Sequence, residues 1–255
     1  MSSRDRVTPG AQAGSRSPQA VIVTGASRGI GRAIALRFGA DGGDLALIQR
    51  GDASETVRAL GRPAVVEQCN LACAEDAERA VERAIERLGR VDVCVCNAGT
   101  AIRESALDVA LVDFRRIVEL NLVSTFAVAR AAARAMTGGG SIVMTASVLA
   151  FQGGWRVSSY AASKAGVANL VHALANEWAS LGIRVNAVAP GYIANDFTAP
   201  LRADPARFAD LSARIPAGGW GRDEDVAEAV AWLASPAAAY VHGHTLVVDG
   251  GWLGR

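Results

Sequence analysis

Short apolar runs rich in β-branched residues recur along this chain and alternate with segments of helical spacing. Residues 20–24, Ala-Val-Ile-Val-Thr, form the first apolar run, which fits a buried strand. Residues 75–88 show the helical pattern, an apolar stripe opposite a row of Glu and Arg on a solvated face. The predicted strands are residues 20–24, 44–49, 64–68, 91–97, 141–146, 184–189 and 245–248. The predicted helices are residues 30–40, 53–60, 75–88, 109–136, 158–180, 199–213 and 223–234.

This alternation predicts the α/β class, with a doubly wound parallel sheet that carries helices on both faces. The chain has 255 residues, of which 51% are apolar, and this suits one domain with a sizeable core. No repeat or linker divides the sequence. We therefore expect residues 19–255 to form a single domain. Residues 1–18, rich in Ser, Arg, Gly and Pro, are expected to form a flexible tail.

Charge and composition narrow the range of partners. The formal net charge of +1 gives no support for nucleic-acid binding. No apolar run approaches the roughly 18 residues that a membrane span needs, and residues 1–18 lack the apolar core of a secretory signal. The four cysteines lie far from any histidine, so we expect no metal site. Reduced, buried thiols in a cytoplasmic protein are the better interpretation of Cys69, Cys73, Cys94 and Cys96.

A glycine-rich turn lies between the first predicted strand and the first predicted helix. Its glycines are Gly25, Gly29 and Gly31, a spacing that differs from the Gly-x-Gly-x-x-Gly dinucleotide fingerprint. Glycine permits a tight turn and a close approach of backbone to ligand. The helix that follows offers free N–H groups and the positive end of its dipole to a diphosphate. A plain glycine-rich turn is the alternative.

A phenol and an amine lie four residues apart at Tyr160 and Lys164, with the hydroxyl of Ser147 upstream. If the segment is helical, the two side chains share one face. Tyrosine ionises near pH 10, and a neighbouring cation is expected to lower that pKa. The pair would then donate and accept a proton at an alcohol or a carbonyl. The alternative is a half-exposed helix of no catalytic significance.

Several distinctive residues directly follow predicted strands. Besides the glycine turn, they are Asn97-Ala98-Gly99, Ser147 and Pro190-Gly191. Ligands of open parallel sheets bind at the carboxyl ends of the strands. We therefore expect these loops to converge on one site.

Together these motifs resemble those of the short-chain dehydrogenase/reductase family over residues 20–255. The matching positions are Thr24 to Gly31, Asn97 to Gly99, Asn121, Ser147, Tyr160, Lys164, Pro190 and Gly191. The resemblance implies a Rossmann-type domain with a seven-stranded parallel sheet, a nicotinamide cofactor, a small-molecule substrate and a homotetramer.

The resemblance also implies roles for single residues. Tyr160 would be the acid and base, and Ser147 would hydrogen-bond the reacting oxygen. Lys164 would hold the nicotinamide ribose and lower the pKa of Tyr160, while Asn121 would support a water-linked proton relay to Lys164. The implied cofactor-binding residues are Gly25, Ser27, Arg28, Gly29, Ile30, Gly31, Gln49, Arg50, Asn70, Leu71, Asn97, Ala98, Gly99, Tyr160, Lys164, Pro190, Gly191 and Ile193.

The choice between NADP and NAD depends on the end of the second predicted strand. Family members that prefer NAD usually carry an acidic residue there, whereas this chain has Gln49 followed by Arg50. With Arg28 in the glycine turn, two cations would favour the extra phosphate of NADP. Asp52 is an alternative acidic partner for NAD. The adenine position holds Asn70-Leu71, where many members have Asp-Leu.

The substrate is expected to be a sugar acid, because residues from 151 onward resemble the branch of deoxy-gluconate and gluconate dehydrogenases. A sugar acid requires a cation for its carboxylate, preferably a guanidinium. The candidate substrate residues are Arg103, Gln152, Trp155, Arg156, Tyr192 and Arg202. Residues 192–214 are expected to form a mobile lid, hereafter the lid, or else a fixed helical insertion. Reduction of a 3-oxoacyl thioester and a non-catalytic nucleotide-binding role remain as alternatives.

Overall fold

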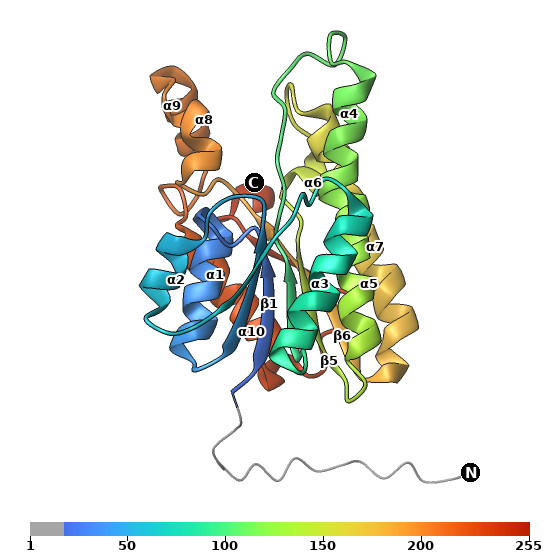
Figure 1. The fold of residues 1–255 in the computed structure, drawn as a ribbon. Coiled ribbons are helices and arrows are strands. Elements are labelled where there is room, and N and C mark those ends of the chain that lie inside the picture. Colours follow the sequence, from blue (N-terminus) through green and yellow to red (C-terminus); the bar gives the residue numbers. More distant parts are fainter. Residues whose placement is uncertain (1–17) are drawn as a thin grey trace, which may run out of the picture.

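Seven parallel strands form one sheet in the order β3-β2-β1-β4-β5-β6-β7 (Figure 1). The computed structural model describes residues 18–255, so nearly all of the predicted tail, residues 1–18, lies outside the described residues. The strand order reverses between β1 and β4, the place where open α/β sheets bind their ligands. The predicted fold class is therefore confirmed. The strands are β1 (Ala20–Thr24), β2 (Asp44–Gln49), β3 (Val65–Gln68), β4 (Val93–Cys96), β5 (Gly140–Thr145), β6 (Ile183–Pro190) and β7 (Thr245–Val248).

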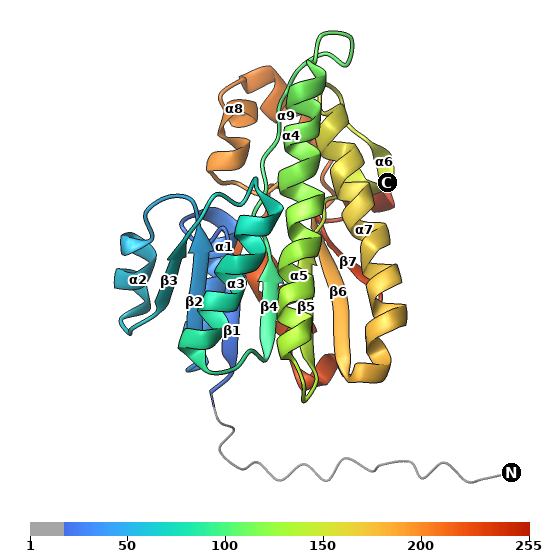
Figure 2. The same cartoon turned by 45° about the vertical axis from the view of Figure 1, so that its right-hand side comes forward.

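Helices cover both faces of the sheet (Figures 1 and 2). Apolar residues of α3, α5 and α7 pack on one face, and those of α1, α2 and α10 pack on the other. The strands between them are nearly continuous apolar runs, as a sheet that is buried on both sides requires. The helices are α1 (Gly29–Ala40), α2 (Ser54–Leu60), α3 (Ala74–Leu88), α4 (Leu111–Val118), α5 (Ser124–Ala135), α6 (Leu149–Gln152), α7 (Ser158–Trp178), α8 (Ala199–Arg202), α9 (Pro205–Ala213) and α10 (Asp223–Ala234).

Two of the predicted helices are interrupted. The helix expected over residues 109–136 starts at Leu111 and contains a π-helical segment, Glu119–Val123, between α4 and α5. The helix expected over residues 199–213 is divided into α8 and α9. There Asp204 accepts hydrogen bonds from the backbone N–H groups of Ala206 and Arg207, and Pro205 occupies the first helical position, so a new helix begins.

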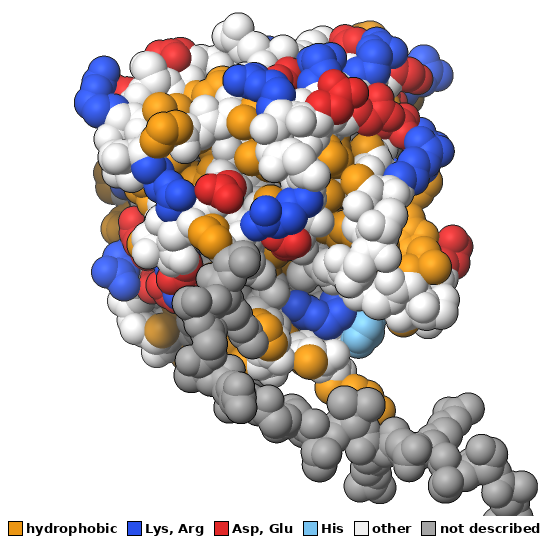
Figure 3. Space-filling view, turned by 60° about the horizontal axis from the view of Figure 1, so that its bottom comes forward, with side chains coloured by type: hydrophobic (Ala, Val, Ile, Leu, Met, Phe, Trp, Pro, Cys, Tyr) orange, Lys and Arg blue, Asp and Glu red, His pale blue; other side chains and the backbone are white. Residues whose placement is uncertain are grey.

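The carboxyl ends of all strands lie at one edge of the sheet. The helices of the lid, α8 and α9, rise above this edge in orange, and the α4 end of the long interrupted helix rises above it in green (Figures 1 and 2). Figure 3 shows the end of the molecule away from this edge, where positive, negative and apolar side chains are interspersed. Within residues 18–255 no helix has the length and apolar character that crossing a membrane requires.

The cysteines differ in burial. Cys94 and Cys96 are buried in β4, but Cys69 and Cys73 are only half-buried, so the expectation of four buried thiols is wrong for the second pair. All four are free thiols. Across the described part of the chain, no three His, Cys, Asp or Glu side chains come together as a metal site would need.

Candidate active site

The glycine turn connects β1 to α1 through very close backbone packing. Gly25 has φ +70 and Gly29 has φ +57, conformations that favour glycine. A Cβ at Gly31 would lie 2.2 Å from the carbonyl oxygen of Gly25, so the start of α1 packs directly on the turn. The glycines therefore hold the first turn of α1 against the end of β1.

The loop after β4 is bonded to this turn. The backbone N–H groups of Asn97 and Ala98 donate to the Thr24 hydroxyl over 3.0 and 3.1 Å, and the Asn97 side chain donates to the Thr24 carbonyl over 3.2 Å. The Thr145 hydroxyl of β5 donates to Asn97 over 3.3 Å. Three strand ends are thus joined.

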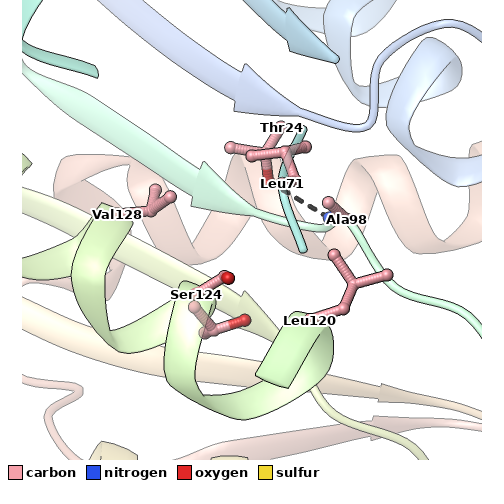
Figure 4. A pocket seen from close by; sticks show the side chains of 7 residues that line it. Thr24, Leu71, Ala98, Leu120, Ser124 and Val128 are labelled. Carbon is pink, nitrogen blue, oxygen red and sulfur yellow. Dashed lines mark hydrogen bonds between the residues drawn. The ribbon is translucent and has the colours of Figure 1, made fainter. Parts of the chain in front are cut away.

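A small cavity lies behind this junction, between the turn and α5 (Figure 4). Thr24, Leu71 and Ala98 line one side, and Ser124 and Val128 of α5 line the other. The cavity has room for about one water-sized molecule. A nucleotide therefore does not fit into this cavity.

The N-terminus of α1 fits a diphosphate. Its N-cap residue, Arg28, makes no side-chain capping bond, and the first turn contains no acidic residue. The first N–H groups of α1 are therefore available to an anion at the positive end of the helix dipole. Arg28 itself is largely exposed and lies 4.0 Å from Asp196 of the lid, while Ser27 and Ile30 are half-buried.

The end of β2 presents one free cation. Gln49 is buried and donates to the Gly51 carbonyl over 3.4 Å, whereas Arg50 is exposed and makes no hydrogen bond or ion pair within residues 18–255. Asp52 is engaged, because its carboxylate accepts from the backbone N–H and the hydroxyl of Ser54 at the start of α2. These hydrogen bonds lower the pKa of Asp52.

The remaining predicted cofactor residues line the same edge. Asn70 is exposed and its side chain accepts from the N–H of Ala72, which leaves its amide N–H groups free, and Leu71 is buried. Gly191 packs so closely on Asp249 that a Cβ would lie 2.7 Å from it. The buried Ile193 accepts a hydrogen bond from the Thr198 hydroxyl.

A chain of buried polar groups runs beneath the edge of the sheet. Asn121, fully buried in the π-helical segment, exchanges two hydrogen bonds of 2.9 Å with the backbone of Thr100 and donates to the Ser163 hydroxyl over 3.0 Å. Lys164 donates to the Thr145 carbonyl over 2.5 Å. A Cβ on Gly99 would lie 3.1 Å from Asn121 and 3.5 Å from the Lys164 amine, so Gly99 gives these groups space.

Lys164 is the only lysine of the chain, and its side chain is almost completely buried. Burial lowers the pKa of its amine from 10.5 to about 8. At neutral pH the amine is therefore still mostly protonated.

Tyr160 lies on the same face of α7, and its ring centroid is 5.8 Å from the Lys164 amine. Burial raises the pKa of the phenol, while a hydrogen bond with the Ser147 side chain and the positive charge of Arg103 lower it. The direction thus differs from the expected lowering of this pKa, because the effect of burial outweighs the groups that lower it. A neutral phenol at pH 7 suits a proton donor.

Ser147 is buried just beyond the end of β5. Its hydroxyl oxygen accepts the backbone N–H of Leu149 over 3.2 Å, which fixes the side chain at the start of α6. This short helix lies between Ser147 and Tyr160 and was not predicted from the sequence. It folds the intervening residues so that Ser147 acts on the pKa of the Tyr160 phenol.

The candidate substrate residues fall into two groups. Arg103 donates to the Phe197 carbonyl of the lid over 3.1 Å, and Phe197 packs at 5.8 Å against the ring of Tyr160. Gln152 and Trp155 are exposed beside them. Arg156, with φ 59, stacks 5.3 Å from the Trp155 ring and is the one non-glycine residue with positive φ in the described chain.

The other group belongs to the lid. Tyr192 stacks against Trp220 at 5.1 Å and Trp252 at 4.7 Å, which anchors the lid to the C-terminal turn. Arg202 donates to the carbonyl of Asn195 over 3.0 Å, so its guanidinium is held by the lid itself.

Comparison with known proteins shows the family. The family model described as "Enoyl-(Acyl carrier protein) reductase" matches residues 25–253. The 2-dehydro-3-deoxy-D-gluconate 5-dehydrogenase of Escherichia coli (strain K12) is 42% identical over 240 residues, which cover 92% of this chain and 95% of the relative. This chain belongs to the short-chain dehydrogenase/reductase family.

Solved structures of this family share the fold. A candidate NAD(P)-dependent gluconate 5-dehydrogenase from Beutenbergia cavernae, with NADP bound at low occupancy, has a TM-score of 0.89 and 45% identity. A candidate 2-deoxy-D-gluconate 3-dehydrogenase from Agrobacterium tumefaciens, with bound NADP, has a TM-score of 0.87 and 40% identity. In both comparisons the match covers 93% of this chain and 97% of the other.

The structure brings Asn121, Lys164, Tyr160 and Ser147 together, as expected for a short-chain dehydrogenase/reductase. Sequence reasoning missed the Thr145 carbonyl, because a backbone acceptor has no sequence signal. It also missed Phe197 and Arg207, which face the site only because the lid folds over the edge of the sheet.

Proposed function

We propose that this protein is an NADP-dependent oxidoreductase that interconverts a secondary alcohol and a ketone on a sugar acid. One observation carries the proposal: the Tyr160 phenol and the Ser147 hydroxyl lie close together beside the buried Lys164, at the carboxyl edge of the sheet. Two hydroxyls that meet next to an amine suit the polarisation of one carbonyl oxygen.

In the direction of reduction, Tyr160 donates its proton to the carbonyl oxygen, and Ser147 donates a hydrogen bond to the same oxygen. The nicotinamide, when bound, supplies the hydride chemistry. Lys164 would hold the nicotinamide ribose and return a proton towards Tyr160, and Asn121 would keep the relay to Lys164 in place. The buried bonds of Asn121 and Lys164 support these roles, because they leave each group one orientation.

The preference for NADP is supported by charge at the end of β2. Arg50 is exposed and unpaired in the described chain, and Asp52 is already bound to Ser54. Arg28, in the glycine turn, is also largely exposed. A 2′-phosphate would find a guanidinium there and no free carboxylate. Gly25 to Gly31, Asn97 to Gly99 and Pro190 to Ile193 would hold the rest of the cofactor.

The relatives named for deoxy-gluconate and gluconate support a sugar acid as substrate. Arginines around the site agree with an anion, whereas a 3-oxoacyl thioester needs no carboxylate partner. Reduction of such a thioester is therefore the less supported function.

The proposal is tested with a panel of sugar acids and neutral ketones, assayed with NADP(H) and NAD(H) by the absorbance of the reduced nicotinamide. We expect turnover of at least one sugar acid, with a higher kcat/KM for NADP(H). Turnover of acyl thioesters alone would favour the alternative, and turnover of neither class with either cofactor would refute the proposed activity.

We also propose a cytoplasmic homotetramer. Four free thiols agree with a reducing compartment. β7 is an edge strand with Val247 exposed, and Tyr240 beside it is fully exposed, as apolar side chains at a subunit contact would be before assembly. Light scattering on a size-exclusion column measures the mass, and a monomer would contradict the proposal.

A further inference from the structure

The inner face of lid helix α9 carries one arginine. Arg207 is half-buried, and Leu211, one turn later on the same face, is buried against Val148 and Trp252. The guanidinium of Arg207 lies 5.9 Å from the ring of Trp155, so it spans from the lid to the loop between β5 and α7.

Tyr192 packs with Leu211 of α9 and lies 4.7 Å from the ring of Trp252, on which the guanidinium of Arg214 stacks. Burial raises the pKa of Tyr192, and the positive charges of Arg207, Arg214 and Arg103, in that order of size, oppose the rise. They come from α9, from the residue that ends it, and from the loop after β4. Asp210 is the one carboxylate that acts on the same phenol, so positive charge is in excess.

The three arginines are not equally available. Arg214 stacks 4.0 Å above the ring of Trp252, and Arg103 is bonded to the Phe197 carbonyl. Arg207 reaches only Asp210, at 3.5 Å, among hydrogen-bond partners in residues 18–255. Its planar fork therefore has donors to spare for a carboxylate.

Arg103 connects this cationic group to the reacting centre. Its charge acts on the phenol of Tyr160 as well as on that of Tyr192. Arg103 is bonded to the carbonyl of Phe197, whose ring packs on that of Tyr160, so a molecule with its carbonyl at Tyr160 has an arginine beside it for an anionic end. We propose that Arg207 binds the carboxylate of the substrate, with Arg103 and Arg214 completing the cationic site around the Tyr192 hydroxyl. The proposal rests on the sugar-acid function and names the residue that selects the acid.

The test compares two polyols that differ in charge, D-gluconate and D-glucitol, by calorimetric titration into the protein saturated with NADPH, which cannot oxidise either alcohol. The wild-type protein should bind gluconate more tightly than glucitol. In Arg207→Gln the Kd for gluconate should rise roughly 10- to 100-fold, the range for one charge-assisted hydrogen-bonded pair, while glucitol is unaffected. Arg207→Lys should fall between the two, because it keeps the charge but loses the fork.

Two further variants separate the site from general charge effects. Arg79→Gln removes an exposed arginine of α3 and should leave both Kd values unchanged. Asp210→Asn frees Arg207 from its carboxylate partner and should tighten gluconate binding about two- to threefold. Arg207 is more than a third exposed in its side chain, so the folded state should tolerate its replacement, as a melting curve will confirm.

Equal affinity for gluconate and glucitol in the wild-type protein, or an unchanged gluconate Kd in Arg207→Gln, would overturn the inference. Such a result together with turnover of a sugar acid would leave the proposed function standing. Conversely, gluconate binding that depends on Arg207, without turnover of any sugar acid, would refute the function and keep the anion site.

Discussion

The polar groups under the sheet edge and the arginines around that edge differ in burial and in the number of their hydrogen-bond partners. Asn121 and Lys164 are buried and have short hydrogen bonds to backbone or hydroxyl partners. Arg28, Arg50 and Arg207 are exposed or half-exposed and have few or weak partners in the described chain. The interior groups are thus held by their hydrogen bonds, whereas the arginines keep donors free for a ligand.

This difference corresponds to two tasks, proton transfer and the recognition of anionic groups. A proton must pass between atoms that are held within hydrogen-bond reach, and burial in a bonded network gives that precision. Recognition of a phosphate or a carboxylate needs positive charge and hydrogen-bond donors next to the anionic group of the ligand, and exposed arginines supply both. We therefore expect interior changes to abolish chemistry and peripheral changes to alter preference.

The largest effect should follow from Tyr160→Phe. Removal of the phenolic hydroxyl takes away the proton donor and should lower kcat roughly 10²- to 10⁴-fold. Cofactor affinity, measured by nicotinamide fluorescence, should change less than about twofold, because the ring still packs against Phe197. Tyr240→Phe, at a fully exposed tyrosine, is the matched control. An unaltered kcat in the Tyr160 variant would reject the role of this residue.

The second effect concerns the stability cost of the buried amine. The pKa of Lys164 is about 8 in the folded chain and 10.5 in the unfolded chain. Between these values the unfolded chain binds the extra proton, so the free energy of unfolding should rise as pH increases from 8 to 10.5. At about 1.4 kcal/mol per pH unit, the rise is up to about 3 kcal/mol.

Urea unfolding of the cofactor-free protein at pH 7.5 and 10.5 measures this rise, and Lys164→Met supplies the background from all other groups. Because the chain has one lysine, ¹⁵N-lysine labelling gives one side-chain NMR signal, which reports its pKa directly. The same pH dependence in both proteins, or a signal that titrates near 10.5, would show that burial does not perturb this amine.

The sequence predicted the sheet and the bonded interior well, since both depend on local patterns. Apolar runs placed all seven strands to within about two residues, and helical spacing put Tyr160 and Lys164 on one face. The π-helical segment around Asn121 was missed, because it is a single rare turn inside a longer helix.

The periphery was harder to predict. Arg202 and Arg207 are both lid arginines, and nothing in their spacing indicates which of them faces the site. The break at Asp204 and Pro205 sets the orientation of α9, and only the packing of Leu211 decides which side turns inward. Long-range contacts of this kind are not encoded in a window of neighbouring residues.

Cofactor preference should respond to Arg50→Asp. The change replaces the free guanidinium with a carboxylate that repels a 2′-phosphate and accepts from ribose hydroxyls. The ratio of kcat/KM for NADPH to that for NADH should fall roughly 10- to 100-fold, with kcat nearly constant. Arg79→Asp makes the same charge change on α3 and should leave the ratio intact. A ratio that also stays constant in Arg50→Asp would make Arg50 a bystander.

The smallest effect should come from Trp155, the exposed ring that contacts Arg156 and Arg207. Its side chain is 74% exposed, so Trp155→Ala should leave the melting temperature nearly unchanged. Each exposed cation–π contact is worth about 0.5–1 kcal/mol, so the loss of the ring should raise KM for the sugar acid about two- to fivefold at constant kcat. Trp155→Phe keeps a ring and should raise KM less. A fall in kcat comparable to that of Tyr160→Phe would mean that the periphery takes part in the chemistry, and the division between interior and periphery would then be wrong.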